Sequence, residues 1–260
     1  MQWWHILLIV LGSLLLLLAL SIVLYKPFFK RFWDLILSGI AIIVLSPFLL
    51  ILSLLGLIFM KGNPFFVQVR PGKKKRDGNE KLFKLIKFRT MSNKKDSSGN
   101  LLADEERLNG YGKFLRSTSL DELPELFNIF IGDMSIIGPR PQLVRDMVFM
   151  SEAQRHRHDV RPGLSGLAQV SGRNNITWEQ KFEYDLQYIK KISLFGDIGL
   201  IFKTVFKVFK RSDVVRDGTV SDIDFGDWLL QEGKVSKADY DRNLRKVKKV
   251  INTYYENCAS

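Results

Sequence analysis

Cysteine is almost absent from this 260-residue sequence, which has only Cys258. A single cysteine cannot form an internal disulfide, so the soluble part of the chain needs no oxidising compartment. The sequence also lacks a zinc-ligand cluster, a Walker A motif and a Ser-His-Asp arrangement with a nucleophile elbow. His156 and His158 stand two apart beside arginines, which indicates a solvated face rather than a metal site. These absences argue against disulfide scaffolds, zinc proteins, P-loop enzymes and serine hydrolases.

Charged residues are scarce in the first sixty positions, which are almost entirely apolar, and abundant after them. The formal net charge of +12 therefore lies mostly on the part of the chain after Phe59. Such a balance suits nucleic acid, an anionic membrane surface or a phosphorylated substrate. The apolar start favours a membrane. Nucleic acid is disfavoured, because the chain has no aromatic-basic repeat and no known reading motif.

The first apolar run covers residues 6–24. At about 1.5 Å per residue, some twenty residues cross a hydrocarbon core of roughly 30 Å. No Lys or Arg precedes the run, whereas Lys26, Lys30 and Arg31 follow it, so the positive-inside bias places its C-terminal end in the cytoplasm. A cleaved signal peptide would need a basic start and a small-residue cleavage site, and both are missing. We therefore predict a transmembrane helix within residues 1–29.

The second apolar run covers residues 35–60 and contains Ser46 and Pro47 near its middle. Proline removes a backbone donor and clashes with the preceding turn, so a kink is expected there. Basic residues flank both ends, which therefore both prefer the cytoplasmic side. A helix bent at Ser46-Pro47 that enters and leaves on one face satisfies this preference, with the Ser46 hydroxyl bonding a freed carbonyl. A plain second transmembrane helix, which would place the rest of the chain outside, remains open on these grounds alone. The absence of disulfide chemistry mildly favours re-entrance.

The remaining chain predicts an α+β domain of short elements. Alternation over residues 65–69 and a second run at 81–89, joined by a turn at 76–79, indicate a β-hairpin, and residues 96–100 form a loop. The run at 196–210 has one apolar and one basic face, which suits either the headgroup region or the cap of a core. Thr177 and Gln180 have the spacing of a capping box. Helices are expected at residues 103–115, 122–130, 143–157, 178–189, 196–210 and 238–254.

Polar residues crowd positions 117–124, around Asp121 and Glu122. A helix starting near Asp121 would place both carboxylates at its positive end. The alternative is structural, because Ser119 and Glu122 have capping-box spacing. The same domain carries arginines, lysines and Gly/Pro loops that suit phosphate oxygens. A carboxylate pair among phosphate-binding groups indicates phosphoryl transfer assisted by a divalent cation.

Six stretches, in the same order, resemble the monotopic phosphoglycosyl transferases, the bacterial sugar transferases that start the assembly of surface glycans. The resemblance covers roughly residues 30–214. One such stretch would be a weak signal, whereas six in order make a chance similarity implausible. The stretches are KRFWD at 30–34, SP at 46–47, KFRTM at 87–91, LDELP at 120–124, GDMS at 132–135 with GPRP at 138–141, and RPG at 161–163 with GRN at 172–174.

The resemblance implies a re-entrant helix at residues 30–61, broken at Ser46-Pro47, and a catalytic domain at residues 62–216 on the cytoplasmic face of the bacterial inner membrane. It also implies a two-step reaction. Asp121 attacks the sugar-bearing phosphate of a UDP-sugar and releases UMP, and polyprenyl (undecaprenyl) phosphate then takes the phosphosugar from the enzyme. Mg²⁺ would bind near Asp121 and Glu122.

By position, the resemblance also nominates residues that contact phosphate or uridine. Two acidic residues, Asp185 and Asp197, match acidic positions of the family, although a structural salt bridge explains each equally well. The sequence leaves open the sugar, the lipid length and whether the protein forms a homodimer or binds glycan-assembly partners. The basic candidates are Lys87, Arg89, Arg140, Arg161 and Arg173.

Two features depart from the family pattern. Minimal members begin close to residue 30, whereas this chain has an additional span before it. The extension at residues 217–260 lies outside the resemblance, so a partner-binding or sugar-specific role is open there. A hypothesis from another class is a membrane-anchored scaffold that recruits glycan-assembly enzymes, with the acid pair serving only as a helix cap.

Overall fold

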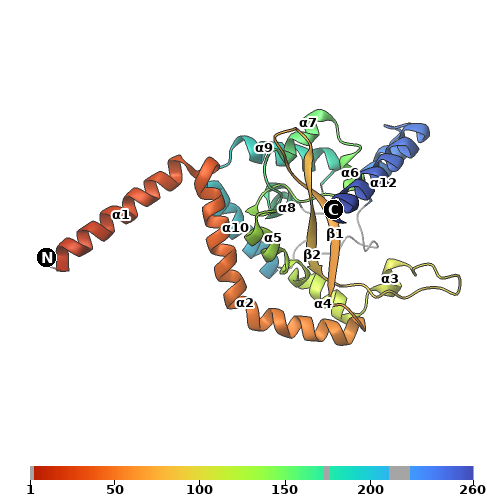
Figure 1. The fold of residues 1–260 in the computed structure, drawn as a ribbon, viewed down its shortest axis with the longest axis horizontal. Helices are drawn as coiled ribbons and strands as arrows, with labels where there is room; N and C mark the ends of the chain where they lie inside the picture. Colours follow the sequence, from red (N-terminus) through yellow and green to blue (C-terminus); the bar gives the residue numbers. More distant parts are fainter. Residues whose placement is uncertain (1–2, 173–175, 211–222, 260) are drawn as a thin grey trace.

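The computed structural model describes residues 3–172, 176–210 and 223–259. Two apolar N-terminal helices precede a helix-rich domain that contains a small antiparallel β-hairpin (Figure 1). The first helix, α1 (Trp3–Val23), projects away from the domain, and a π-helical turn, η1 (Tyr25–Phe29), joins it to α2 (Lys30–Met60). By length and composition, α1 and the segment Tyr25–Met60 could each cross a bilayer. The predicted α+β class and the two apolar helices are confirmed.

Helix α2 is visibly bent, and Figure 1 shows its two arms running in different directions. Pro47 stands inside this helix. Because Pro47 has no backbone N–H, it cannot donate to the carbonyl of Ile43 four residues before it. The Ser46 hydroxyl donates to that carbonyl instead, at 2.8 Å. The kink and the compensating serine are therefore as predicted, although the helix continues through the bend instead of breaking.

The start of α2 is fastened to the domain by Lys30, Arg31 and Asp34. Lys30 forms an ion pair, Arg31 satisfies carbonyls at the end of α5 (Glu125–Ile131), and Asp34 accepts two hydrogen bonds from β3 (Ser135–Ile137). Charged groups that leave water need such partners, so these contacts fix the orientation of α2 on the domain. The contacts are Lys30 Nζ to Asp197 (2.5 Å), Arg31 to the Ile129 and Phe130 carbonyls (2.6 and 2.8 Å), and Asp34 from the Ser135 hydroxyl and the Ile136 amide (2.6 and 2.9 Å).

The hairpin consists of β1 (Phe65–Lys74) and β2 (Glu80–Phe88), which pair antiparallel as predicted. Helix α5 is attached to the edge of β2 by one amide side chain. The Asn128 side chain accepts from the Ile86 amide at 3.0 Å and donates to the Lys84 carbonyl at 2.8 Å. These two hydrogen bonds fix the position of β2 relative to the segment that carries Asp121 and Glu122.

The core lies between α2, the hairpin and α5. Leu52 of the second arm of α2 is buried with Leu115 of α4 (Gly110–Thr118), and the Tyr111 hydroxyl donates to the Leu52 carbonyl at 2.7 Å. A neighbouring cluster joins Ile129 of α5 to Phe83 of β2. Burial of these side chains drives the packing of α2 against the domain.

Two predicted helices are each split in the structure. The predicted helix at 103–115 is α3 (Asp104–Arg107) and α4, because Asn109 caps α4 by accepting from the Gly112 amide at 2.8 Å. The predicted helix at 143–157 is α6 (Val144–Met147), α7 (Glu152–Arg155) and a 3-10 turn (His156–Asp159), since Ser151 and Gln154 form a capping box that starts α7. In each stretch a polar capping residue starts a new helix, although the apolar periodicity runs on through that position.

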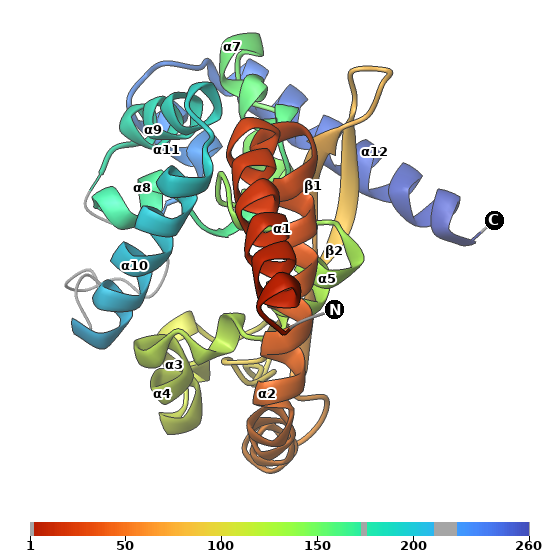
Figure 2. The ribbon, with the colours of Figure 1, turned by 90° about the vertical axis from the view of Figure 1, so that its left-hand side faces the viewer.

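A second, two-stranded sheet pairs β3 with β4 (Gly163–Ser165) in parallel. The strands are too short to show alternation, and the sequence did not predict them. After α8 (Leu167–Ser171), α9 (Trp178–Lys190) begins at the predicted Thr177–Gln180 capping box. Helix α10 (Leu194–Lys210) buries Leu200 against Ile137 and exposes Phe195, Phe202 and Phe206. Figure 2 shows α10 on one side of α2 and the hairpin on the other.

The C-terminal extension packs against the domain through α11 (Phe225–Gln231) and α12 (Lys237–Ala259). Phe225 is buried together with Trp178 and Phe182 of α9. One face of α12 covers Val69 of β1 and Met147 of α6. The predicted tail helix at 238–254 is confirmed and extends further at both ends, whereas α11 was not predicted.

Candidate active site

The acid pair lies in a 3-10 turn, η2 (Leu120–Glu122), between α4 and α5. Ser119 has a left-handed backbone (φ 57°, ψ 20°), ends α4, and makes no side-chain capping bond to the turn. Helix α5 begins only at Glu125, after Pro124. The interpretation of Ser119 and Glu122 as a capping box is therefore wrong. The helix expected to start near Asp121 is a 3-10 turn that contains both acids, and the α-helix starts only after it. The turn presents both acids to the side of β2.

Glu122 is held by two cations. Its Oε1 atom is 3.0 Å from Lys87 Nζ and 2.6 Å from Arg140 Nη2. Lys87 also forms an ion pair with the buried Glu125 at 3.0 Å. Burial alone would raise the pKa of Glu122, but Arg140 and Lys87 outweigh it and hold this pKa well below its usual range. Glu122 is thus a permanently charged partner for both cations.

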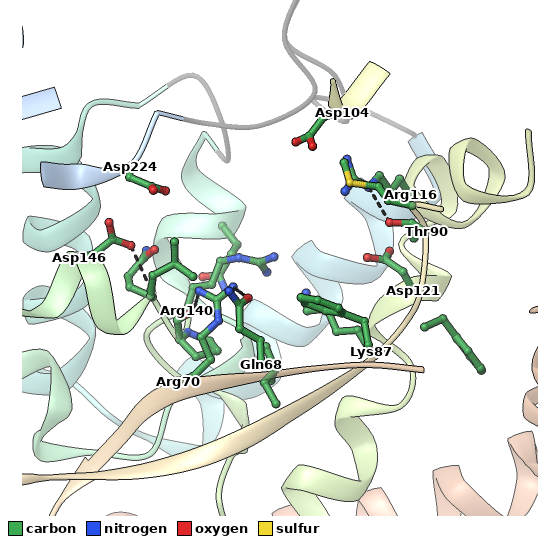
Figure 3. Close-up of a pocket in the computed structure, with 18 of the residues that line it drawn as sticks. Gln68, Arg70, Lys87, Thr90, Asp104, Arg116, Asp121, Arg140, Asp146 and Asp224 are labelled. Atoms are coloured by element: carbon green, nitrogen blue, oxygen red, sulfur yellow. Dashed lines mark hydrogen bonds between the residues drawn. The ribbon is translucent and has the colours of Figure 1, made fainter. Parts of the chain in front are cut away.

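Asp121 faces a cavity (Figure 3). Burial raises the pKa of Asp121 to about 6 and the neighbouring charge of Glu122 adds to the rise, while Lys87 and Arg140 oppose it. At neutral pH the carboxylate remains largely ionised, and it is less strongly solvated than a surface acid. Such a carboxylate, close to cations, can attack an electrophilic phosphorus.

The cavity has a volume of about 800 Å³, which is in the range of small-molecule sites. Figure 3 shows Asp121 and Arg116 toward one side, and Asp146 and Asp224 toward the other, with Arg140 between them. The Arg116 guanidinium donates to the Thr90 hydroxyl at 3.1 Å. The cationic residues in its wall are Arg70, Lys87, Arg89, Arg107, Arg116, Arg140 and Lys181.

A second, smaller cavity of about 190 Å³ adjoins the same ion pairs. Arg140 and Gln169 line both cavities, and Glu122 lines the second. Within the described chain, both polar atoms of the Gln169 amide are buried without a hydrogen-bond partner. The remaining wall is mostly apolar and includes Ile201, Val205 and Val208 of α10.

Comparison with known proteins decides the family. The model of the family described as bacterial sugar transferase matches residues 24–211. The chain belongs to this family. The family resemblance seen in the sequence motifs is confirmed. The prediction that the chain is an enzyme of this transferase class is also confirmed.

Several curated proteins are similar to this bacterial sugar transferase. The "Uncharacterized sugar transferase EpsL" of Bacillus subtilis (strain 168) is 44% identical over 194 residues, which are 74% of this chain and 93% of the relative. "Exopolysaccharide production protein ExoY" of Rhizobium meliloti (strain 1021) is 35% identical over 194 residues, 68% of this chain and 83% of the relative. The "UDP-glucose:undecaprenyl-phosphate glucose-1-phosphate transferase" of Klebsiella pneumoniae is 42% identical over 191 residues, 70% of this chain but only 40% of the relative.

The structure of this sugar transferase brings five predicted site residues to the first cavity. They are Asp121, Lys87, Arg89, Arg140 and Asp185. Glu122 borders the second cavity. Ser46 and Pro47 form the bend of α2.

Two other candidates lie elsewhere. Arg161 does not line the first cavity, and its Nε donates to the Gly132 carbonyl at 2.7 Å, at the end of α5. Asp197 likewise is absent from that wall and binds the Lys30 ammonium and the Tyr25 and Tyr188 hydroxyls. Both positions suit a structural role. Arg173 lies outside the residues that the structure describes.

Asp185 keeps both of its predicted interpretations. It lines the cavity, and it also forms a buried ion pair with Arg157 at 2.7 Å. The Arg157 guanidinium in turn donates to the Arg140 carbonyl at 2.7 Å. Asp185 therefore supports the loop that carries Arg140, whatever else it contacts.

Sequence reasoning missed several residues of the sugar transferase site. Arg116 precedes Asp121 by five residues in a polar stretch, and a cation that close to the acids was a usable signal. Glu125 follows Pro124 directly, yet its position at the start of α5 hid its pairing with Lys87. Gln169 and Asp224 carried no signal, because only the tertiary fold brings them to the cavities.

The oxygen atoms of Asp121 and Glu122 are compatible with a magnesium ion that substrate phosphates help to bind. Among the described residues, no group of three or more His, Cys, Asp or Glu side chains is placed to hold a metal. Both cations that contact Glu122 use Oε1, so Oε2 lies outside these ion pairs. Mg²⁺ at phosphoryl-transfer sites commonly takes one or two protein carboxylates, substrate phosphates and waters. The donor set therefore fits a substrate-completed site and does not form a protein-only cage.

Proposed function

We propose that this protein transfers a sugar-1-phosphate from a UDP-sugar to polyprenyl phosphate, through a covalent intermediate on Asp121, and releases UMP. The arrangement of Asp121 carries the proposal, because a half-buried carboxylate faces a large cationic cavity beside an acid that two cations already neutralise. The name of the Klebsiella relative, a UDP-glucose:undecaprenyl-phosphate glucose-1-phosphate transferase, supports both substrate classes.

In the first step, a carboxylate oxygen of Asp121 forms a bond to the sugar-bearing phosphorus of the donor. The bond from this phosphorus to the bridging oxygen breaks, and its electron pair leaves with UMP. Arg89, Arg116 and Arg140 line the same cavity and offset the negative charge that accumulates on the phosphate oxygens. A bound Mg²⁺ would supply further charge neutralisation next to Asp121 and Glu122.

In the second step, an oxygen of the acceptor phosphate attacks the phosphorus of the Asp121 adduct and releases the carboxylate. The product is a sugar joined to the lipid through a diphosphate. The second cavity supports an acceptor with an apolar tail, since α10 gives it an apolar wall next to Glu122 and Arg140. Val205 belongs to this wall and is itself 47% exposed, on the helix whose outer face exposes Phe202 and Phe206. An acceptor embedded in lipid can approach from that side.

We also place the protein in the bacterial cytoplasmic membrane. In this arrangement α1 crosses the bilayer, and α2 enters and leaves at the cytoplasmic face by means of its bend. The apolar outer face of α10 lies at the headgroups, and Asp121 stands at the boundary between water and lipid. Support comes from the exposed apolar side chains of α1, α2 and α10 and from the bend at Pro47.

The test is single-turnover chemistry on purified protein. Wild-type protein with a UDP-sugar and Mg²⁺, but without acceptor, should release up to one equivalent of UMP and gain the mass of a phosphosugar on the peptide that contains Asp121. Asp121→Asn should lose the adduct and at least about 10³-fold in turnover, because an amide is a poor nucleophile. Asp77→Asn, an isosteric change in the exposed hairpin turn, is the matched control and should behave as wild type.

Two results would contradict the proposal. One is near-normal turnover by Asp121→Asn. The other is glycan synthesis restored by an Asp121→Ala, Glu122→Ala double variant in cells that lack the protein. The second result is what a membrane scaffold predicts.

A further inference from the structure

The C-terminal extension contributes to the wall of the first cavity. The family match ends at residue 211, and the first described residues after it, Ile223 and Asp224, both line this cavity. Figure 3 shows Asp224 and Asp146 on the side of the cavity opposite Asp121. Part of the cavity wall is therefore built by a segment beyond the region that the family model matches.

Polar contacts anchor this segment. Asp224 pairs with Arg145 of α6 at 2.8 Å, and the same guanidinium pairs with Asp227 at 2.5 Å. The Phe225 amide donates to Asp146 at 2.9 Å. The Trp178 indole N–H donates to the Ile223 carbonyl at 3.3 Å. These contacts tie the extension to α6 and α9, the two helices that supply neighbouring parts of the wall.

Apolar packing holds the segment as well. Phe225 is only 2% exposed; its ring stacks on Trp228 and contacts the rings of Trp178 and Phe182 at steeper angles. Helix α12 then buries one face against β1 and α6. Asp224 therefore has a fixed position at the cavity, which a specificity determinant requires.

Acidic and basic side chains occur together in the cavity wall: Asp104 pairs with Arg107, and Arg70 lies near Asp146 and Asp224. Figure 3 shows Arg116 and Asp104 toward the side of Asp121, and Asp146 and Asp224 on the opposite side. Trp178, whose indole donates to the Ile223 carbonyl, lines the same cavity, as do Arg89 and Arg107. The nucleotide part of a UDP-sugar carries negative charge, which arginines attract and carboxylates repel. A sugar ring of the common neutral kind is uncharged and presents hydroxyl donors, which carboxylates accept, and an apolar face, which an indole can cover.

We propose that the C-terminal extension forms the sugar-selecting wall of the donor site, with Asp224 accepting a hydrogen bond from a hydroxyl of the donor's sugar. Trp178 lies beside that sugar, and the nucleotide lies toward Arg89, Arg107 and Arg116. This inference rests on the proposed function, because it assigns an orientation to the donor of that reaction.

The test uses the full chain and a matched pair of variants. Asp224→Asn and Asp227→Asn each remove a carboxylate that pairs with Arg145, but only Asp224 lines the cavity. For each protein, KM and kcat are measured with UDP-glucose, UDP-galactose and UDP-N-acetylgalactosamine, together with the inhibition constant of UMP.

Asp224→Asn should lower kcat/KM for the preferred UDP-sugar about 10- to 100-fold and change the order of preference. Its UMP inhibition constant should stay unchanged. Asp227→Asn should keep the wild-type preference.

Each other outcome overturns the proposal. An Asp224→Asn protein with unchanged preference shows that Asp224 does not select the sugar. A UMP inhibition constant that rises in parallel with the donor KM places the nucleotide at the extension. Equal changes in kcat/KM and in substrate preference in the Asp224 and Asp227 variants show that both carboxylates act only structurally, through their ion pairs with Arg145. If wild-type protein releases no UMP from any UDP-sugar, the proposed function itself is wrong and this inference falls with it.

Discussion

Asp121 and Glu122 are neighbours in the chain, but their surroundings give them opposite electrostatic properties. Burial and the adjacent negative charge raise the pKa of Asp121, whereas Arg140 and Lys87 hold the pKa of Glu122 low despite its burial. Environments that shift the pKa values of two carboxyl groups in opposite directions commonly give the two groups different roles. In the proposed reaction Asp121 is the nucleophile, and Glu122 orients the cations beside it.

This division of roles predicts different defects for the two isosteric variants. Glu122→Gln removes the charge that holds Lys87 and Arg140, so turnover should fall about 10- to 100-fold while the Asp121 adduct still forms. Asp121→Asn should abolish the adduct. Mass spectrometry of protein quenched during turnover, together with UMP release, separates the two cases. An adduct that disappears equally in both variants would contradict the assignment.

His158 is buried beside Glu80, so the interpretation of both histidines as a solvated face holds only for His156. Burial lowers the pKa of His158 to about 4, although the hydrogen bond with Glu80 opposes the change. In the unfolded chain this pKa returns to about 6.5. Because the unfolded chain binds the proton first, the stability from neutral His158 is present above pH 6.5 and is lost as the pH falls toward 4.

Neutral His158 should therefore make the folded state less stable at pH 5 than at pH 7, against the opposite contribution of Asp121 and Glu125, whose pKa values burial raises to about 6 and about 7. His158→Gln should reduce this pH dependence, whereas His156→Gln, at an exposed ring paired with Asp159, should keep it. Denaturant titrations of the detergent-solubilised protein at both pH values measure the effect. Equal pH dependence in wild type and His158→Gln would exclude His158 as the titrating group.

Among the elements, the bend of α2 is the basis of the proposed topology. The positive-inside bias favours both ends of α2 on one side, and the bend at Pro47 gives the helix two differently directed arms. Single cysteines at Lys26 and Lys61, in a Cys258→Ser background, should both react with a membrane-impermeant reagent only when the cytoplasmic face is open. Labelling of the two positions from opposite faces would refute re-entrance.

Elements with a long and uniform signal were predictable from the sequence. The two apolar helices, the hairpin and the amphipathic α10 depend on patterns repeated over many residues, and the kink depends on the chemistry of Pro47 alone. The splits at Asn109 and Ser151 were not predicted, because one side-chain cap ends or starts a helix there against the apolar periodicity. The short strands β3 and β4 exist only through tertiary pairing.

The candidate site was predictable to a similar extent. Asp121, Lys87 and Arg140 lie in motifs of the family and do line the cavity. Arg161 and Asp197 also match positions of the family, but they bind a helix-end carbonyl and the start of α2 instead. A matching position does not distinguish a residue that contacts substrate from one that holds the framework.

In the whole molecule, α1 stands apart from both cavities. Only Ser21 of this helix is buried, and no residue of α1 lines either cavity. A chain that starts at Tyr25 should therefore keep its UMP release in detergent within about twofold and stay bound to membranes through α2. Membrane fractionation and the UMP assay test both statements. Loss of activity in detergent would show that α1 supports the fold of the site.

The two cavities share Arg140 and Gln169 but have otherwise different walls. In the proposed reaction, the soluble donor and the lipid acceptor therefore enter by separate routes. Enzymes whose two substrates alternate in a single binding site are slowed when either substrate is in excess, since each occupies the form of the enzyme meant for the other. Separate entrances remove that competition. Initial rates should thus rise to a plateau with increasing nucleotide sugar at fixed lipid, without a decline at the highest concentrations.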